Sequence, residues 1–355
     1  MIQKIKLAGK CLDQPLLVGK FKKAVPFVFV AGAALYGANE VKKAPEGQKK
    51  RTAINVTSIL TATVVSSLAA PKIAAKLVGK PYEKYALNEI KTKNTALVDE
   101  FVKTGIELSD NTKNILEKAK TKVLNFKEVK NLNSELSQTK QGKKFFNTLI
   151  PEPDNISAKD IRDDIARLSI MGAIPVAGGV AGGIIGEKIS DKKISKAKMA
   201  DRVKEGAYQY LANIFLCNIG AGLALAGMEK MNIKSKSARA LGMITGIVTT
   251  GIIGGNAIAN FIGRKIINPI FEDKETRKQN KNKAPERIPE VVDICLHSDD
   301  IATIAVMSGL KWIEPSLPIL YGISGYRAGI GYRNGKKHNL YNEAKVNNTV
   351  NNVTK

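Results

Sequence analysis

Three uncharged polar residues lie inside long apolar stretches of the chain, where they could line a path for a small solute. They are Asn218, Asn256 and Thr245. Such side chains either contact a permeating solute or hydrogen-bond to a neighbouring helix, which contributes roughly 0.6 kcal/mol on average. Coupled transport commonly uses a charged residue within the span, and the four clearest apolar stretches contain none. Pro26 and Pro175 could break their helices, as prolines do at transporter sites. We favour hydrogen bonds between helices and keep a small-solute transporter or channel as the alternative.

A second group with chemical potential surrounds one of the two histidines. His297 lies four residues after Asp293 and just before Asp299 and Asp300. These side chains could supply metal ligands, but a metal site needs further ligands, and an aspartate here also suits the start of a helix. No pairing of a nucleophile with a base, or of two carboxylates, stands out. We therefore expect no catalysis, no bound metal and no cofactor.

Small residues recur every four positions in two of the apolar stretches. This spacing places them on one helix face, and a face without large side chains lets two backbones approach closely. A phosphate-binding loop would need a preceding strand or a terminal Gly-Lys-Ser/Thr, and both are missing. We interpret the two faces as glycine zippers. They consist of Gly178, Gly182 and Gly186, and of Gly251, Gly255, Ala259 and Gly263.

The elements that must position these residues are four charge-free stretches, each about as long as a spanning helix of roughly 17 to 25 residues. They cover residues 52–71, 168–186, 206–228 and 240–263. A fifth stretch, 24–39, is short for a full span, so a shallow or re-entrant insertion is the alternative there. A sixth, 301–326, is interrupted by charge. The sequence predicts an all-α, polytopic or hairpin-inserted membrane helix bundle with glycine-zipper packing and a small amphipathic helical insert.

The net charge of +24 follows the apolar stretches. Residues 1–80 and 167–355 carry the excess, whereas residues 81–166 are nearly balanced. A basic collar around apolar helices favours anionic lipid headgroups, and each nearby Lys or Arg contributes on the order of 1 kcal/mol. Nucleic acid is not an expected partner, because aromatic residues for base stacking make up only 6% of the chain. The residues assigned to lipid headgroups are Lys72, Lys76, Lys80, Trp312 and Arg327.

Changes in composition divide the chain into five parts. Residues 1–80 form a basic N-terminal arm plus an apolar helical hairpin. Residues 81–150 form an amphipathic helical insert of two or three helices, with breaks near Asp110 and near 141–142. The remaining parts are a glycine-rich membrane helix bundle (151–271), a charged linker plus the final interrupted apolar segment (272–330), and a disordered basic, asparagine-rich tail (331–355).

Three functional hypotheses follow from these features. The first is an integral membrane scaffold or organising protein in a bacterial inner membrane or its equivalent. It would self-associate into a homo-oligomer through its small-residue faces and hold anionic lipid with its basic flanks. The second is a small-solute transporter or channel. The third is a soluble helical protein whose basic surface binds a polyanion, which carbonate extraction of membranes separates from the other two.

Overall fold

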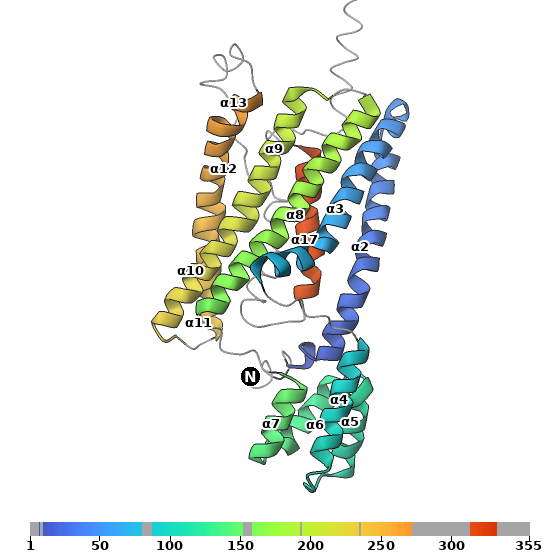
Figure 1. Ribbon diagram of the computed structural model, residues 1–355, viewed down its shortest axis with the longest axis vertical. Helices are drawn as coiled ribbons and strands as arrows, with labels where there is room; N and C mark the ends of the chain where they lie inside the picture. The colour runs from blue at the N-terminus through green and yellow to red at the C-terminus, as the bar shows by residue number, and fades with distance from the viewer. Residues whose placement is uncertain are drawn as a thin grey trace, which may run out of the picture. The chain divides into compact units, whose positions relative to one another are not determined.

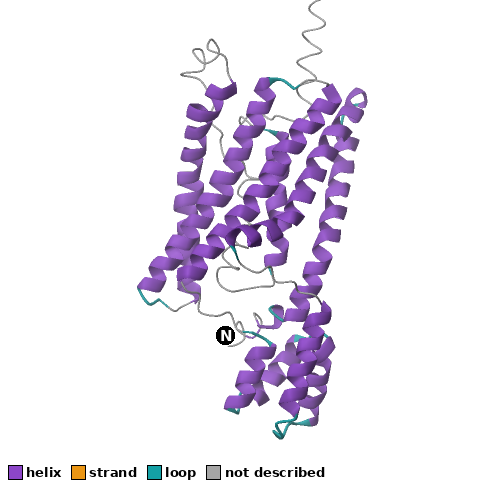
Figure 2. Ribbon diagram, viewed as in Figure 1, coloured by secondary structure: helices purple, strands orange, loops and turns teal. Residues whose placement is uncertain are grey.

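Every regular element in the described part of the chain is a helix, which confirms the predicted all-α class (Figure 1, Figure 2). The computed structural model describes residues 7, 10–79, 87–151, 158–191, 194–233, 236–271 and 313–331. Within these ranges, five helices are long and apolar enough to cross a membrane, which suggests a membrane location. They are Pro15–Lys43, Glu46–Val78, Lys159–Asp191, Lys196–Lys230 and Ala238–Phe271.

The chain divides into two compact units. The first contains Met1–Pro26, Glu83–Ile156 and Ala305–Ser316, and the second contains Phe27–Tyr82, Ser157–Ile304 and Leu317–Lys355. The helix α2, Pro15–Lys43, begins in the first unit and ends in the second. All the glycine faces predicted from the sequence belong to the second unit.

The second unit is a bundle organised around one long helix, α8, Ala158–Asp191 (Figure 1). On one side α8 packs along α3, Lys49–Val78, and on another along α17, Leu317–Ile330. It also contacts a continuous helical run that changes from α to π and back. This run consists of α9 (Lys196–Tyr210), η2 (Leu211–Phe215) and α10 (Leu216–Lys230).

The last long run of the bundle packs against α10 and α9 and is also mixed α and π. This last run contains α11 (Lys236–Gly246), η3 (Ile247–Gly255), α12 (Asn256–Ile262), η4 (Gly263–Ile267) and α13 (Asn268–Phe271).

Two other helices of the bundle are each preceded by a short 3₁₀ turn. These turns are η1 (Glu46–Gln48) before α3 and η5 (Glu314–Ser316) before α17.

Two expectations about individual segments need correction. The stretch at 24–39 lies within a helix of 29 residues, so it is long enough for a full span. Pro26 and Pro175 do not break their helices, because each lies inside a continuous helix. Each proline removes one backbone hydrogen bond, and the bonds on either side preserve the helix. The sixth stretch is described from residue 313 onward, where α17 is only 14 residues long.

Within residues 87–151, which are described throughout, the first unit contains four short amphipathic helices where two or three were expected. They pack around one apolar core, in which the rings of Phe101 and Phe145 stack with centroids 3.9 Å apart. The break expected near Asp110 is confirmed, since a helix starts there. The helices are α4 (Leu87–Val102), α5 (Asp110–Thr121), α6 (Phe126–Leu136) and α7 (Lys140–Leu149).

The break expected near 141–142 is also confirmed, since α6 ends at Leu136 and α7 begins at Lys140, although residues 141 and 142 themselves lie in the first turn of α7 and not in the break. Gly142 serves the helix start instead: its backbone N–H donates to the hydroxyl of Thr139 at 3.0 Å, an N-cap bond. A Cβ at this position would lie 2.4 Å from the carbonyl oxygen of Leu136. The glycine therefore marks a tight approach to the preceding helix rather than a turn.

Part of the N-terminal basic arm folds with these four helices. Gln14 donates to the carbonyl of Leu124 at 2.8 Å and accepts from the backbone N–H of the same residue at 2.8 Å. Lys10 donates to the side chain of Asn147 at 2.7 Å, and its ammonium lies 4.7 Å from the ring centroid of Phe146. The part of the arm around Lys10 and Gln14 therefore packs as a component of the first unit.

Candidate functional site

The first glycine face of α8 lies directly against small residues of α3. A Cβ on Gly178 would lie 2.1 Å from the hydroxyl of Ser66, and one on Gly182 would lie 2.6 Å from the carbonyl oxygen of Ser58. At Gly186 the same atom would come 3.0 Å from the Cα of Asn55. Backbone atoms of the two helices are therefore in direct contact over two turns, which only a side-chain-free face allows.

A second glycine face of α8, one residue further along, lies against α17. The contact is backbone to backbone, because a Cβ on Gly179 would lie 1.7 Å from the carbonyl oxygen of Gly325. A Cβ on Gly183 would lie 2.3 Å from the carbonyl oxygen of Gly329. The spacing in the sequence led us to expect only one close-packed face on this helix. Instead, Gly178 and Gly182 contact α3, while the adjacent Gly179 and Gly183 contact α17.

The second predicted glycine set packs against α10 and η2 over most of its length. A Cβ on Gly251 would lie 2.1 Å from the sulfur of Cys217, and one on Gly255 would lie 2.6 Å from the Cα of Ala212. Ala259 is buried and packs in a small cluster that includes Ala212. Gly263 differs, because a Cβ there would meet nothing within 4 Å. Close approach thus ends before the last member of the set.

An ion cluster around one buried carboxylate lies where the ends of α3, α8 and α9 meet. The side chain of Glu187 is only 4% exposed, and its carboxylate accepts from the guanidinium of Arg202 at 2.6 Å. It also pairs with Lys198 and lies 3.5 Å from the guanidinium of Arg51. Arg51 pairs in turn with Asp191. A buried carboxylate with several basic partners is far more tolerable than a lone buried charge.

Arg202 extends this cluster to a fourth helix. Its Nε donates to the backbone carbonyl of Gly329 at 2.9 Å, and its side chain is 8% exposed. The space it occupies is open because Gly183 has no side chain: a Cβ there would lie 2.5 Å from the Arg202 Nε. The ion cluster therefore depends on the same glycine that lets α8 and α17 touch.

From this cluster, a row of buried polar side chains runs along α9, η2 and α10. Gln209 donates to the carboxylate of Glu205 at 2.8 Å, and Asn213 donates to the amide oxygen of Gln209 at 2.9 Å. Asn218 follows and donates to the hydroxyl of Ser169 in α8 at 3.5 Å. All four residues of the row are at most 3% exposed. Asn213 lies in the π-helical segment η2, where backbone hydrogen bonds join residues five apart. A side chain five residues later, at Asn218, therefore still lies on the same side of the helical run.

The three predicted path-lining residues do not lie together. Asn218 belongs to the buried row. Thr245 is exposed on α11, and its hydroxyl donates to the carbonyl of Leu241 at 3.0 Å, so it faces away from the row. The side chain of Asn256 lies outside the described residues.

The predicted headgroup residues also divide into groups. Lys72 and Lys76 are exposed near the end of α3, as a headgroup contact requires. Arg327 is only 4% exposed inside the bundle, so we no longer assign it to headgroups. Lys80 and Trp312 lie outside the described residues.

The metal hypothesis at His297 also falls on residues that are not described. Among those that are, no group of three or more His, Cys, Asp or Glu side chains could hold a metal ion.

The buried row and the contacts of Arg202 escaped prediction because their charged residues lie just outside the charge-free stretches. Glu205 lies one residue before the stretch that begins at 206, and Arg202 lies four before it. The signal was nevertheless present, since Glu205, Gln209 and Asn213 recur every four residues and therefore share one helix face. A polar face on a helix that continues into an apolar span indicates a buried polar row.

The chain matches no protein-family model, and comparison with curated proteins and with solved structures gives no match. The geometry of the bundle therefore carries the functional argument.

Proposed function

We propose that the chain is an integral membrane scaffold or organising protein, whose bundle is held together by glycine-zipper packing and flanked by basic residues on anionic lipid. A bacterial inner membrane or its equivalent is the proposed location. The small unit with α4 to α7 would be the part that the bundle anchors. Nothing in the arrangement of the described side chains leads us to propose catalysis.

The observation that carries this proposal is an inverted distribution of polarity in the second unit. Large apolar side chains are exposed on its helices, with Leu35 74% exposed and Leu241 and Ile253 each 66% exposed. Charged and amide side chains lie inside, with Glu205 and Gln209 both 0% exposed. A water-soluble protein buries the first kind and exposes the second. Lipid is the solvent that stabilises the opposite arrangement.

The glycine faces support packing within one chain. Gly182 and Gly255 are already covered by other helices of the same molecule, so these faces are not free to bind a second copy. A homo-oligomer would have to use the outward apolar faces, for example the one that contains Leu241 and Ile253 on α11 and η3. We therefore propose that the zippers build the bundle and that any self-association is secondary.

Asymmetric cysteine labelling tests the membrane location and orientation together. In a chain without its native cysteines, single cysteines replace Lys50 and Lys72, which are exposed and lie on α3. At 1.5 Å per residue they are about 33 Å apart, more than the roughly 30 Å hydrocarbon core. In intact cells, a membrane-impermeant maleimide should label one position and reach the other only after permeabilisation. Equal labelling of both, together with release by carbonate, would establish the soluble polyanion-binding alternative instead.

The small-solute transporter or channel is a second candidate, favoured by the buried polar row. Our sequence argument against it was that the apolar spans contain no charged residue. Glu205 removes that argument, because it is fully buried in the helical run that forms the candidate span Lys196–Lys230. Ionisable residues inside spans commonly mark ion or proton paths.

A flux assay in liposomes tests this second candidate. If the row conducts protons or small cations, Glu205→Gln and Asn218→Leu should both reduce flux by at least tenfold. Thr245→Val is the matched control, because its hydroxyl faces away from the row and bonds only within its own helix. Flux no greater than that of protein-free liposomes, or equal flux in all three variants, would reject transport through the row.

A further inference from the structure

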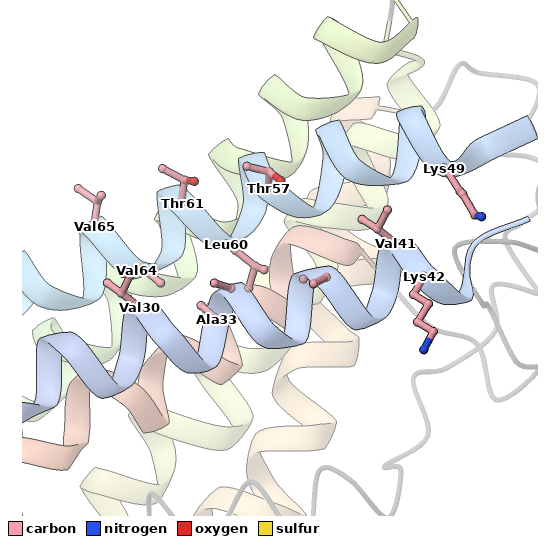
Figure 3. Close-up of a pocket in the computed structure, with 13 residues that line it drawn as sticks. Val30, Ala33, Val41, Lys42, Lys49, Thr57, Leu60, Thr61, Val64 and Val65 are labelled. Atoms are coloured by element: carbon pink, nitrogen blue, oxygen red, sulfur yellow. The ribbon is translucent and has the colours of Figure 1, made fainter. Parts of the chain in front are cut away.

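An open groove lies between α2 and α3, within the second unit (Figure 3). Its volume is about 800 Å³, within the range of roughly 300 to 1,000 Å³ typical of sites for small organic ligands. Its walls are mostly apolar, and two lysines, Lys42 and Lys49, also line it. The other lining residues are Val30, Ala33, Ala34, Gly37, Ala38, Val41, Thr57, Leu60, Thr61, Val64 and Val65.

The groove exists because α2 meets its neighbours at few points and presents small residues to α3. Tyr36 contacts α17 instead: the rings of Tyr36 and Tyr326 pack edge to face with centroids 5.2 Å apart. Towards α3 the close contact is at Gly37, where a Cβ would lie 2.9 Å from the Leu60 side chain. On either side of this point, alanines on α2 leave the space between the helices unfilled.

Both lysines line the same end of the groove. Figure 3 shows Lys42 and Lys49 at the end where α2 and α3 are joined, with Val30, Val64 and Val65 at the far end. Lys49 pairs with Glu46, which is 89% exposed and therefore strongly solvated. No ion pair of Lys42 is found among the described residues, and its side chain is exposed. This end of the groove is thus suited to an anionic group.

The length of the groove matches one leaflet of a bilayer. From Lys42 to Val30 along α2 is about 18 Å, and from Lys49 to Val65 along α3 is about 24 Å, at 1.5 Å per residue. Half of a bilayer, including its headgroup region, is roughly 20 to 22 Å thick. A molecule with an anionic head at the lysines and hydrocarbon along the walls would therefore end near the bilayer midplane.

We propose that this groove is a binding site for one anionic phospholipid, with its phosphate at Lys42 and Lys49 and its acyl chains between α2 and α3. The site rests on the membrane location argued under the proposed function. Thr57 and Thr61 also line the groove, and both are exposed. A second copy of the chain fits less well, because each copy carries a net charge of +24 and would bring like charge to the lysines.

Lipid retention by the full chain tests the site. The protein is extracted in mild detergent and reconstituted into nanodiscs of phosphatidylcholine, with or without phosphatidylglycerol. After re-extraction, native mass spectrometry counts the lipid that stays bound to each chain. The wild-type chain should retain about one phosphatidylglycerol and exchange it for phosphatidylcholine poorly.

Two variants and a matched control distinguish lipid bound in the groove from lipid attracted to the charged surface in general. The double variant Lys42→Gln/Lys49→Gln should hold the lipid roughly 25-fold more weakly, at about fivefold per lysine. Lys43→Gln/Lys50→Gln removes the same charge from the same helix ends outside the groove, so its effect should be less than fivefold. Ala34→Trp fills the groove without changing charge and should also displace the lipid.

Several results would overturn the proposal. Equal losses in the two double variants would indicate diffuse attraction to a charged surface, and unchanged retention in Ala34→Trp would place the lipid elsewhere. Retention of phosphatidylcholine as firmly as phosphatidylglycerol would remove the role of the lysines. A dimer that Ala34→Trp dissociates would make a second copy the occupant. Release of the chain from membranes by carbonate is a separate outcome, which rejects the membrane location before any lipid is counted.

Discussion

Replacing Gly182 with alanine should force α3 and α8 apart. The added Cβ would lie 2.6 Å from the carbonyl oxygen of Ser58 and 2.9 Å from the Cα of Ile59, and both are backbone atoms that cannot rotate away. Ordinary contact begins at 3.4 Å, so the helices must separate by about 0.8 Å at this point. Overpacking of this kind typically costs about 1 to 3 kcal/mol.

Alanine also has a higher helix propensity than glycine, by about 1 kcal/mol, which offsets part of this cost. Gly32→Ala on α2 measures that gain alone, because a Cβ there meets nothing within 4 Å. The difference in the free energy of unfolding between the two variants should therefore be about 1 to 3 kcal/mol. For a bundle of this size that corresponds to a midpoint roughly 2 to 12 °C lower for Gly182→Ala than for Gly32→Ala.

The assay uses Cys217, which is fully buried and reacts with a fluorogenic thiol dye only when the bundle opens. Serine at Cys11 and Cys295 removes the other two thiols. Thermal unfolding of the detergent-solubilised protein then reports the second unit alone. Equal midpoints for the Gly182 and Gly32 variants would refute the reasoning, because they would show that the helices do not touch at this face.

Three further predictions concern the ion cluster, the first unit and the second glycine set. Glu187→Gln should lower the free energy of unfolding by about 3 to 5 kcal/mol, because Arg202 would stay buried without its charged partner. The pKa of Glu135 is held below its usual range by bonds from the hydroxyl and the backbone N–H of Ser109. The stabilisation that the Glu135 carboxylate contributes is complete above its unfolded-state pKa and is lost as the pH falls through its lower folded-state pKa. Hydrogen exchange in α5 and α6 should therefore accelerate on acidification, and it should accelerate less in Glu135→Gln. Gly220→Ala should destabilise the contact between α10 and α11, since its Cβ would lie 2.2 Å from a backbone oxygen of α11.

Each of these predictions has a control or a contrary outcome. Glu46→Gln removes an exposed pair and should change little, so a loss as large as that of Glu187→Gln would count against a special role for the cluster. If hydrogen exchange in α5 and α6 stayed equally sensitive to acid in Glu135→Gln, the sensitivity would arise from other carboxylates. Unchanged dye reactivity of Cys217 in Gly220→Ala would show that α10 and α11 separate freely.

The helical class was predictable because two simple signals recur along the chain. Long charge-free stretches have the length of a span, and the four-residue spacing of Gly178, Gly182 and Gly186 gives one helix face. The contact of that face with α3 was not predictable, because spacing within one helix does not name its partner. The same limit applies to Gly263, which continues the pattern but meets open space.

Exposure of polar residues was harder to predict than the helices that carry them. Thr245 and Asn218 look alike as polar residues in apolar stretches, yet one faces outward and the other is buried. The difference is set by how α10 and α11 are rotated about their axes, which depends on contacts between distant segments. The hydrogen bonds of Gln14 to Leu124 had no local signal either, since they join residues 110 positions apart.

The two-sided glycine surface of α8 also has a mechanical consequence. Flat surfaces fix how near the flanking helices come, and the few side chains that fit into them fix the position of α8 along its axis. Ser66 of α3 fills the space beside Gly178, and Ile165 of α8 fills the space beside Gly222 of α10. The polar contacts at Glu187 and Ser169 add two further fixed points, so a slip of α8 along its axis would have to break side-chain packing and hydrogen bonds together.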